Sequence, residues 1–486
     1  MSEAPQSTNV VEAQTIAPRR IDASCRVPLL VLFLSAALWL VIGWVFALIA
    51  SIKFHAPTFL ADIPWLTYGR IHPASRDSVV YGFCLPAGLG IALWLFARLG
   101  RTTLAQRWLA TLGAAIWNLG VTIGVLRVLA GAGAGFEDLE IPWHPAVLLF
   151  VGYLLLGISA MLTFHQRRER PLFVSQWFLF TALFWFPWIY STATLLVTLF
   201  PVRGVAQAVL AWWFSNNLRT VWLGLAGLAT IFYFVPKLTG RELHSHYLAL
   251  FAYWVLVLFG SWAGIPNSAP VPAWMPSVSN VGTVLLMLAL IAVALNVYGT
   301  TGRFALFSVA NTPLSFVLFG TASFLIAGLM QLAAALPDPT PALNLTWFHL
   351  AQTALHTYGF FVMALSGALY YILPRLIGTE PVSAGLMRLH FWLAAAGVVL
   401  LCVPLAIGGV LQGLALDNPK LAFLDISRST LPFLRVSTVG DLLLLVGNAL
   451  FLANLVGLVA RFYLARMRAV YADVTADLFK TAGAKP

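Results

Sequence analysis

Charged residues are scarce in this chain of 486 residues. Asp, Glu, Lys and Arg together make up 9% of it, whereas hydrophobic residues make up 60%. Soluble domains carry roughly 25% charged residues, so the composition excludes an ordinary soluble protein. Cysteine is also scarce: there are three, none in a CxxC pair, which argues against a disulfide framework or a thiolate metal site. The chain also lacks a glycine-rich phosphate loop, a pair of catalytic carboxylates and a Ser-His-Asp arrangement.

Apolar segments, in contrast, are abundant. Twelve of them approach the roughly 20 residues that a membrane-spanning helix needs, and all should be helical because lipid offers no partner to backbone groups. The sequence therefore predicts an all-α membrane protein, a twelve-transmembrane-helix bundle. The spans are expected at about 27–52, 76–98, 105–129, 145–164, 173–200, 207–236, 246–265, 278–300, 312–336, 347–373, 386–412 and 436–464. Residues 1–26 are expected to form a disordered cytoplasmic tail, residues 27–465 the membrane domain, and residues 466–486 a second cytoplasmic tail.

The basic residues alternate between the loops. They cluster after the second, fourth, sixth and tenth spans, as in Arg98, Arg101 and Arg107, or Arg167, Arg168 and Arg170. The opposite loops hold few cations, and one of them carries Glu137, Asp138 and Glu140. The positive-inside rule places both termini in the cytoplasm. The net charge of +11 thus reflects membrane topology, and we expect no nucleic-acid partner.

The sixth span carries an unusual polar cluster. Ser215, Asn216, Asn217 and Arg219 lie at the centre of an apolar stretch from Gln207 to Lys237. An arginine in mid-membrane is expensive, so such residues usually face the bundle interior and mark a site or a partner. Two interpretations stay open: a polar contact between helices, or a remodelled cofactor pocket.

Several motifs together resemble subunit I of the haem–copper oxidases, and most of all the cbb3-type cytochrome c oxidase. YGRIHP resembles the entry to the second helix, and WWFSNN followed by YFVPK resembles the sixth. FGSWAGIPNS resembles the seventh helix, and MALSGALYYILPRLIG the tenth with its exit. The last span, FLRVSTVGDLLLLVGNALFLANLVGLVARF, resembles the twelfth. The motifs occur in the family's order and cover most of the chain.

The resemblance implies two haems and a copper ion held by histidines, yet the corresponding positions lack histidine here. The copper ligands fall on Asn216, Pro266 and Asn267, and the redox-active tyrosine falls on Gly260. The ligand of the second helix falls on Ser75. The two haem ligands of the tenth helix fall on Gln352 and Ala354. Arg219, one turn from Asn216, would repel a copper ion, but it could replace part of the missing charge in a metal-free pocket.

Three histidines are candidates for relocated haem ligands. His72 lies three residues before Ser75, and His349 and His356 flank Gln352 on one helical face. The simpler interpretation is a polar seam within the bundle. We therefore expect no copper and no haem, with a haem b held by His72 and either His349 or His356 as the alternative.

Two functions follow from the resemblance. The first is a degenerate subunit I of a respiratory chain: a membrane scaffold or electron-transfer partner in the bacterial inner membrane, without oxygen reduction. It would contact the lipid bilayer and a cytochrome c-type or other respiratory subunit. The second is a working oxidoreductase or electron carrier with relocated haem ligands. The sequence leaves open whether the chain is an enzyme.

Overall fold

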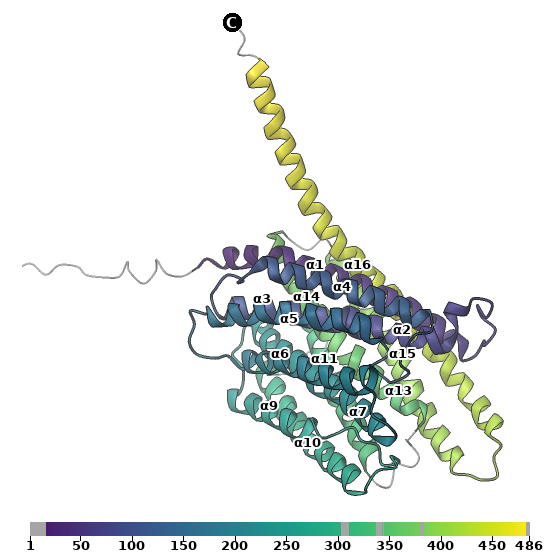
Figure 1. The fold of residues 1–486 in the computed structure, drawn as a ribbon. Helices are drawn as coiled ribbons and strands as arrows, with labels where there is room; N and C mark the ends of the chain where they lie inside the picture. The colour runs from purple at the N-terminus through teal and green to yellow at the C-terminus, as the bar shows by residue number, and fades with distance from the viewer. Residues whose placement is uncertain (1–15, 303–310, 337–342, 344, 380–382, 483–486) are drawn as a thin grey trace, which may run out of the picture.

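The fold is a bundle of long helices, roughly aligned with one another (Figure 1). The computed structural model describes residues 16–302, 311–336, 343, 345–379 and 383–482, with side chains up to Tyr471. Eleven helices in this part of the chain are long and apolar enough to cross a membrane, and the shorter apolar helix α9 (His246–Gly260) brings the number to twelve. The prediction of a twelve-helix all-α bundle is confirmed.

The helical elements follow one another without strands in the described residues. Four spans contain a π-helical segment, labelled η. In chain order the elements are α1 (Pro18–Lys53), the 3-10 turn η2 (Pro64–Leu66), α2 (Tyr68–Val79), η3 (Val80–Cys84), α3 (Leu85–Leu99), α4 (Arg107–Leu129), α5 (Trp143–His165), α6 (Val174–Ala193), η4 (Thr194–Leu199), α7 (Val205–Asn216), η5 (Asn217–Leu223), α8 (Gly224–Thr239), α9, α10 (Trp274–Thr301), α11 (Thr312–Ala335), α13 (Trp347–Ala354), η6 (Leu355–Val362), α14 (Met363–Ile377), α15 (Ala384–Leu416) and α16 (Phe423–Ala482).

Three spans form the inner core of the bundle. The most apolar windows of Tyr68–Leu99, Val205–Thr239 and Trp347–Ile377 are 100%, 83% and 89% buried, whereas those of the other long spans in the described residues are 39% to 50% buried. These are the second, sixth and tenth spans, which carry most of the positions where the resemblance places metal ligands. Each contains a π-helical segment, a feature found mostly as short bulges and often at functional sites.

The first and the last helix both extend beyond the predicted spans. Helix α1 begins at Pro18 rather than near Val27. Its first turns are anchored by the buried Asp22, whose carboxylate accepts from the indole of Trp94 (3.0 Å) and pairs with Arg98 (3.3 Å). Helix α16 continues to Ala482, through the segment expected to be a tail, and leaves the bundle near its end (Figure 1). Its 60 residues give a length of about 90 Å. Residues 1–15 of the expected tail lie outside the described residues.

Candidate functional site

The positions that resemble the copper site form a closed hydrogen-bonded contact between α7 and the loop after α9. The side-chain nitrogen of Asn216 donates to the carbonyl of Gly260 (2.8 Å), and its oxygen accepts from Thr220 (3.0 Å). Gly264, at φ +95°, lies against Asn216 so closely that a Cβ atom there would be 2.3 Å from the Asn216 Cβ. The loop is therefore pressed onto Asn216, and both atoms of its amide are engaged.

The other two copper positions also lack free donors. Pro266 has no side-chain ligand atom, and the side-chain oxygen of Asn267 accepts from Asn280 (2.7 Å). Imidazole nitrogens are the ligands that suit copper, and none lies at these positions. The residues present do not fit a copper ion bound as the family binds it.

Arg219 is the centre of an ion-pair network one turn from Asn216. It lies in η5, and its side chain is 11% exposed. Its Nη2 atom lies 2.6 Å from a carboxylate oxygen of Glu137 and 2.8 Å from one of Asp138. Both carboxylates come from the loop between α4 and α5, which reaches inward to the sixth span. The mid-membrane arginine is thus neutralised by a loop that lies about 80 residues earlier in the chain.

The same loop is held by further contacts. Ser215 donates to the Asp138 carboxylate (2.6 Å), and the Tyr81 hydroxyl donates to the Asp138 backbone carbonyl. The Asp138 side chain is 1% exposed. These contacts of Asp138 with Arg219, Ser215 and Tyr81 all come from core spans. The loop is therefore an integral part of the bundle at this end. We refer to the end of the bundle that carries residues 130–142 as the acidic end.

Arg76 is a second cation in the network. It pairs with Glu137 (2.8 Å) and with Glu140. Both carboxyl oxygens of Asp77 and one of Glu140 are buried without a hydrogen-bond partner. Four carboxyl groups therefore surround two guanidinium groups. This excess of acid favours protonation of part of the cluster.

The pKa values of two carboxyl groups in the loop, Glu137 and Glu140, are shifted in opposite directions. The Arg219 guanidinium holds the pKa of Glu137 far below its usual range, because the charge attraction exceeds the effect of burial. Burial raises the pKa of Glu140 to about 7; Arg76 opposes this shift and the Asp138 carboxylate adds to it. At neutral pH, Glu137 is therefore ionised, whereas Glu140 is partly protonated.

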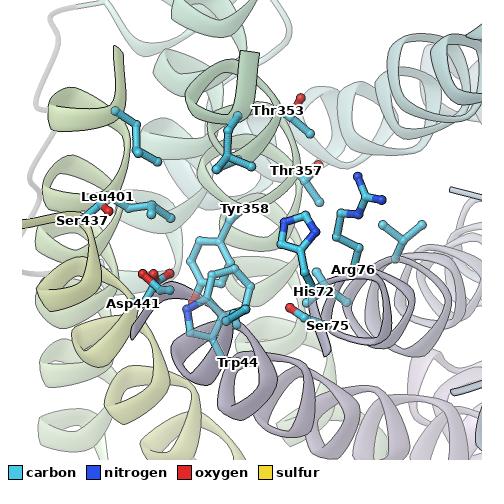
Figure 2. A pocket seen from close by; sticks show the side chains of 18 of the residues that line it. Trp44, His72, Ser75, Arg76, Thr353, Thr357, Tyr358, Leu401, Ser437 and Asp441 are labelled. Carbon is cyan, nitrogen blue, oxygen red and sulfur yellow. The ribbon is translucent and has the colours of Figure 1, made fainter. Parts of the chain in front are cut away.

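A mainly apolar cavity lies beside this network, between the first, second, tenth, eleventh and twelfth spans. Ser75 and Ala354, two positions where the resemblance places haem ligands, both line it, as do Arg76, Arg219 and Asp138. Figure 2 shows the rings of Trp44 and Tyr358 in the middle of the cavity, with His72 and Arg76 on one side and Asp441 on the other. The two ring centroids are 4.5 Å apart.

The three candidate histidines do not form a pair across this cavity. His72 lines it and stacks on Tyr68, at 5.1 Å between ring centroids. The side chain of His349 is 63% exposed and lies 3.9 Å from Glu137. His356 is buried, and its Nε2–H donates to the backbone carbonyl of Arg219 (3.1 Å). Ser75 and Ala354 supply no ligand, so the residues lining the cavity do not fit a bis-histidine haem.

Most of the chain is similar to proteins of one family. Residues 27–443 match the family described as Cytochrome C and Quinol oxidase polypeptide I. The chain belongs to this family. Among its relatives, a cbb3-type cytochrome c oxidase subunit CcoN1 of Stutzerimonas stutzeri is 24% identical over 436 residues, which cover 86% of this chain and 90% of that protein. A cytochrome c oxidase subunit 1 of Rhodobacter capsulatus is 25% identical over 456 residues, which cover 88% and 84%.

A solved structure shares the fold. The chain superimposes on a haem–copper terminal oxidase, solved as a dimer by cryo-electron microscopy, with a TM-score of 0.70 and 15% identity, covering 89% of this chain and 84% of that one. Together with the bacterial relatives, this supports a multi-pass bacterial membrane protein with the haem–copper oxidase subunit I fold. The expected family and fold are confirmed.

The partners of Arg219 escaped the sequence analysis. In the sequence, Glu137 and Asp138 indicate only an outer loop, whereas in the fold the ion pairs of Arg219 go to them. A usable signal existed: three acids within four residues, in a chain with 17 in total, need cations nearby if they lie at the membrane.

Proposed function

We propose that this protein is a subunit I homologue that has exchanged its metal centre for an ion-pair network and does not reduce oxygen. Its role is that of a membrane scaffold or electron-transfer partner for other respiratory subunits, among them a cytochrome c-type subunit. The observation that carries the proposal is the Arg219 guanidinium, paired with Glu137 and Asp138 at 2.6 and 2.8 Å one turn from the copper position Asn216.

Electrostatics supports this proposal. Copper and haem iron bring positive charge into the core of an oxidase, and ligands and neighbouring groups are arranged around that charge. Here a fixed guanidinium supplies positive charge at the same level, and the loop carboxylates balance it. A copper ion beside Arg219 would meet repulsion, while the carboxylates are already engaged. The network thus preserves the packing of the three core spans without a metal.

Oxygen consumption tests this proposal. The purified full-length protein, freed of contaminating oxidases, should show no turnover with reduced cytochrome c or with a quinol. A cbb3-type oxidase purified by the same procedure is the positive control. Oxygen turnover that copurifies with this chain through every step would contradict the proposal.

A second candidate is a haem-binding electron carrier with relocated ligands. It is favoured by one observation: His72 lines the apolar cavity that also includes Ser75 and Ala354. If the purified protein is red with a sharp reduced α-band, His72→Ala, His349→Ala and His356→Ala are compared singly. Loss of the band in the first and in one of the other two would establish this alternative.

We also propose that the protein lies in the bacterial cytoplasmic membrane with both termini inside. The basic residues between the spans support this orientation, which places the acidic end outside. Residues 27–465 form the membrane domain in this proposal.

A further inference from the structure

Asp441 is a buried carboxyl group in the membrane-spanning part of α16. It is 6% exposed and lines the cavity. None of the ion pairs among the described residues includes it. Ionisable side chains at this depth are costly and usually serve ion or proton transfer. The ion-pair network of Arg219 does not include Asp441.

A row of polar side chains leads from Asp441 toward the acidic end. Ser51 of α1 and Asp441 line the same cavity and lie close to each other. The Ser51 hydroxyl lies 2.8 Å from that of Thr438, one turn before Asp441 on α16. His55 Nε2, just after the end of α1, lies 3.2 Å from the same Thr438 hydroxyl. Two hydroxyl groups, one on α1 and one on α16, thus lie between the half-buried imidazole of His55 and the buried carboxyl group of Asp441.

We propose that Asp441 is a proton-binding site that exchanges its proton with the acidic end through Ser51, Thr438 and His55. Hydroxyl groups both donate and accept, and an imidazole ring can donate from one nitrogen and accept at the other. A proton that enters at His55 passes along the two hydroxyls, each of which accepts one proton and gives up another. The net change is one proton gained by the Asp441 carboxylate.

The hydroxyls have the alternative acceptors that a relay requires. Thr438 Oγ1 is also 2.9 Å from the backbone carbonyl of Leu434, so its hydrogen can turn away from Ser51 after each transfer. The Ser51 hydroxyl is 2.8 Å from that of Thr438 and lines the cavity together with Asp441, so it can turn toward either. Each hydroxyl can therefore reset between two partners by rotation about one bond.

The other ionisable groups near Asp441 do not offer a second route of this kind. The cavity also holds His72, Arg76, Asp138 and Arg219, but Trp44 and Tyr358 lie between Asp441 and the side of His72 and Arg76 (Figure 2). Cys402 of α15 is also buried near Asp441. The proton on Asp441 is thus directed to the cavity on one side and to His55 on the other.

Infrared spectroscopy of the full-length protein in detergent tests this proposal. A protonated carboxyl group gives a carbonyl stretching band that shifts when the buffer is changed to D2O. We expect a band that is missing in Asp441→Asn. Thr438→Val should keep this band, but the shift after transfer to D2O should become slower by about tenfold or more. A tenfold change corresponds to a modest rise in the activation barrier for proton exchange. Thr430→Val is the matched control on the same helix, because Thr430 is buried and bonds only locally to Ser427, and it should exchange like the wild type.

Two outcomes would overturn the proposal. One is an unchanged carbonyl region in Asp441→Asn. The other is exchange in Thr438→Val at the rate of the wild type. If Asp441→Asn does not fold, Asp441→Glu replaces it: the band should then move to a new frequency, and a band that stays in place would contradict the assignment.

Discussion

At the scale of single residues, Arg219 illustrates how a charge survives in mid-membrane. Its guanidinium is almost completely buried, yet two carboxylates meet it at hydrogen-bond distance. Removing one partner of such a group leaves the other charges unpaired, and this is more damaging than the loss of the pair itself. The three residues therefore act as one unit, and their contribution can be measured.

Replacement of Arg219 by methionine should strongly destabilise the protein. Asp138 would remain buried without its cation, so we expect a loss of about 3 kcal/mol in the free energy of unfolding. Equilibrium unfolding in mixed detergent micelles measures it. Arg101→Met is the matched control, because Arg101 pairs with Glu169 at 3.1 Å but its side chain is 61% exposed; it should lose less than about 1 kcal/mol. Equal effects of the two substitutions would contradict the proposed network.

The Glu140 carboxyl predicts a pH dependence of stability. Its pKa rises from 4.5 in the unfolded chain to about 7 in the folded protein. The folded protein therefore binds this proton more tightly, and the resulting stabilisation is complete below about pH 4.5 and is lost as the pH rises to about 7. Glu137 has the opposite shift, so its stabilisation is lost only as the pH falls below about 4.5.

The variant Glu140→Gln isolates the first effect, because an amide cannot ionise. Between about pH 5 and pH 8, the wild type should lose about 3 kcal/mol more unfolding free energy than the variant. Unfolding curves at the two pH values give this difference. Parallel pH profiles for the two proteins would show that Glu140 is not held protonated by the fold.

The sequence revealed some of these residues and not others, for a physical reason. Arg219 stood out because a charge in an apolar run is visible locally. Glu137 and Asp138 could not be matched to it, since the path of a loop between two spans depends on tertiary packing. For the same reason, His72 could be placed near Ser75, whereas the exposure of His349 and the hydrogen bond of His356 to Arg219 became apparent only in the fold.

At the scale of elements, the helices were predictable and their irregularities were not. Apolar runs indicate spans because the bilayer fixes their length. The π-helical segments η3, η5 and η6 in the core spans have no signature in hydrophobic periodicity. The helical start at Pro18 was missed because its anchors, Trp94 and Arg98, lie on another span.

The loop after α9 gives a test at this scale. Gly264 and Gly378 both have positive φ, at +95° and +76°, but only Gly264 faces a neighbour within 4 Å, namely Asn216. Alanine at Gly378 should lose about 1 kcal/mol of stability from backbone strain alone. Alanine at Gly264 should lose about 2 kcal/mol more, because it overlaps Asn216. Unfolding free energies of the two variants decide this, and equal losses would mean that the loop is not pressed onto α7.

At the scale of the whole molecule, topology follows from the distribution of charge. With both termini in the cytoplasm, reporter fusions in the loops at residues 130–144 and 413–434 should report an external location. Fusions after residue 240 serve as the internal control. A cytoplasmic signal from either of the first two loops would contradict the proposed orientation of the bundle.

The family and fold were accessible from sequence because widely spaced motifs kept their order, and the match over residues 27–443 agrees with them. The chemistry of the site depends instead on a few side chains. The same fold can keep its core helices while the metal ligands are exchanged for other groups, since fold and function are separable.

The haem and copper content of the purified full-length protein tests the central claim most directly. Haem is quantified from the reduced spectrum after extraction in pyridine, and copper by elemental analysis, each relative to polypeptide and with a cbb3-type oxidase treated in parallel. If the Arg219 network occupies the place of the metal centre, the haem content and the copper content should both be far below one per polypeptide. Stoichiometric copper, or a stoichiometric haem that is lost in His72→Ala, would contradict the account.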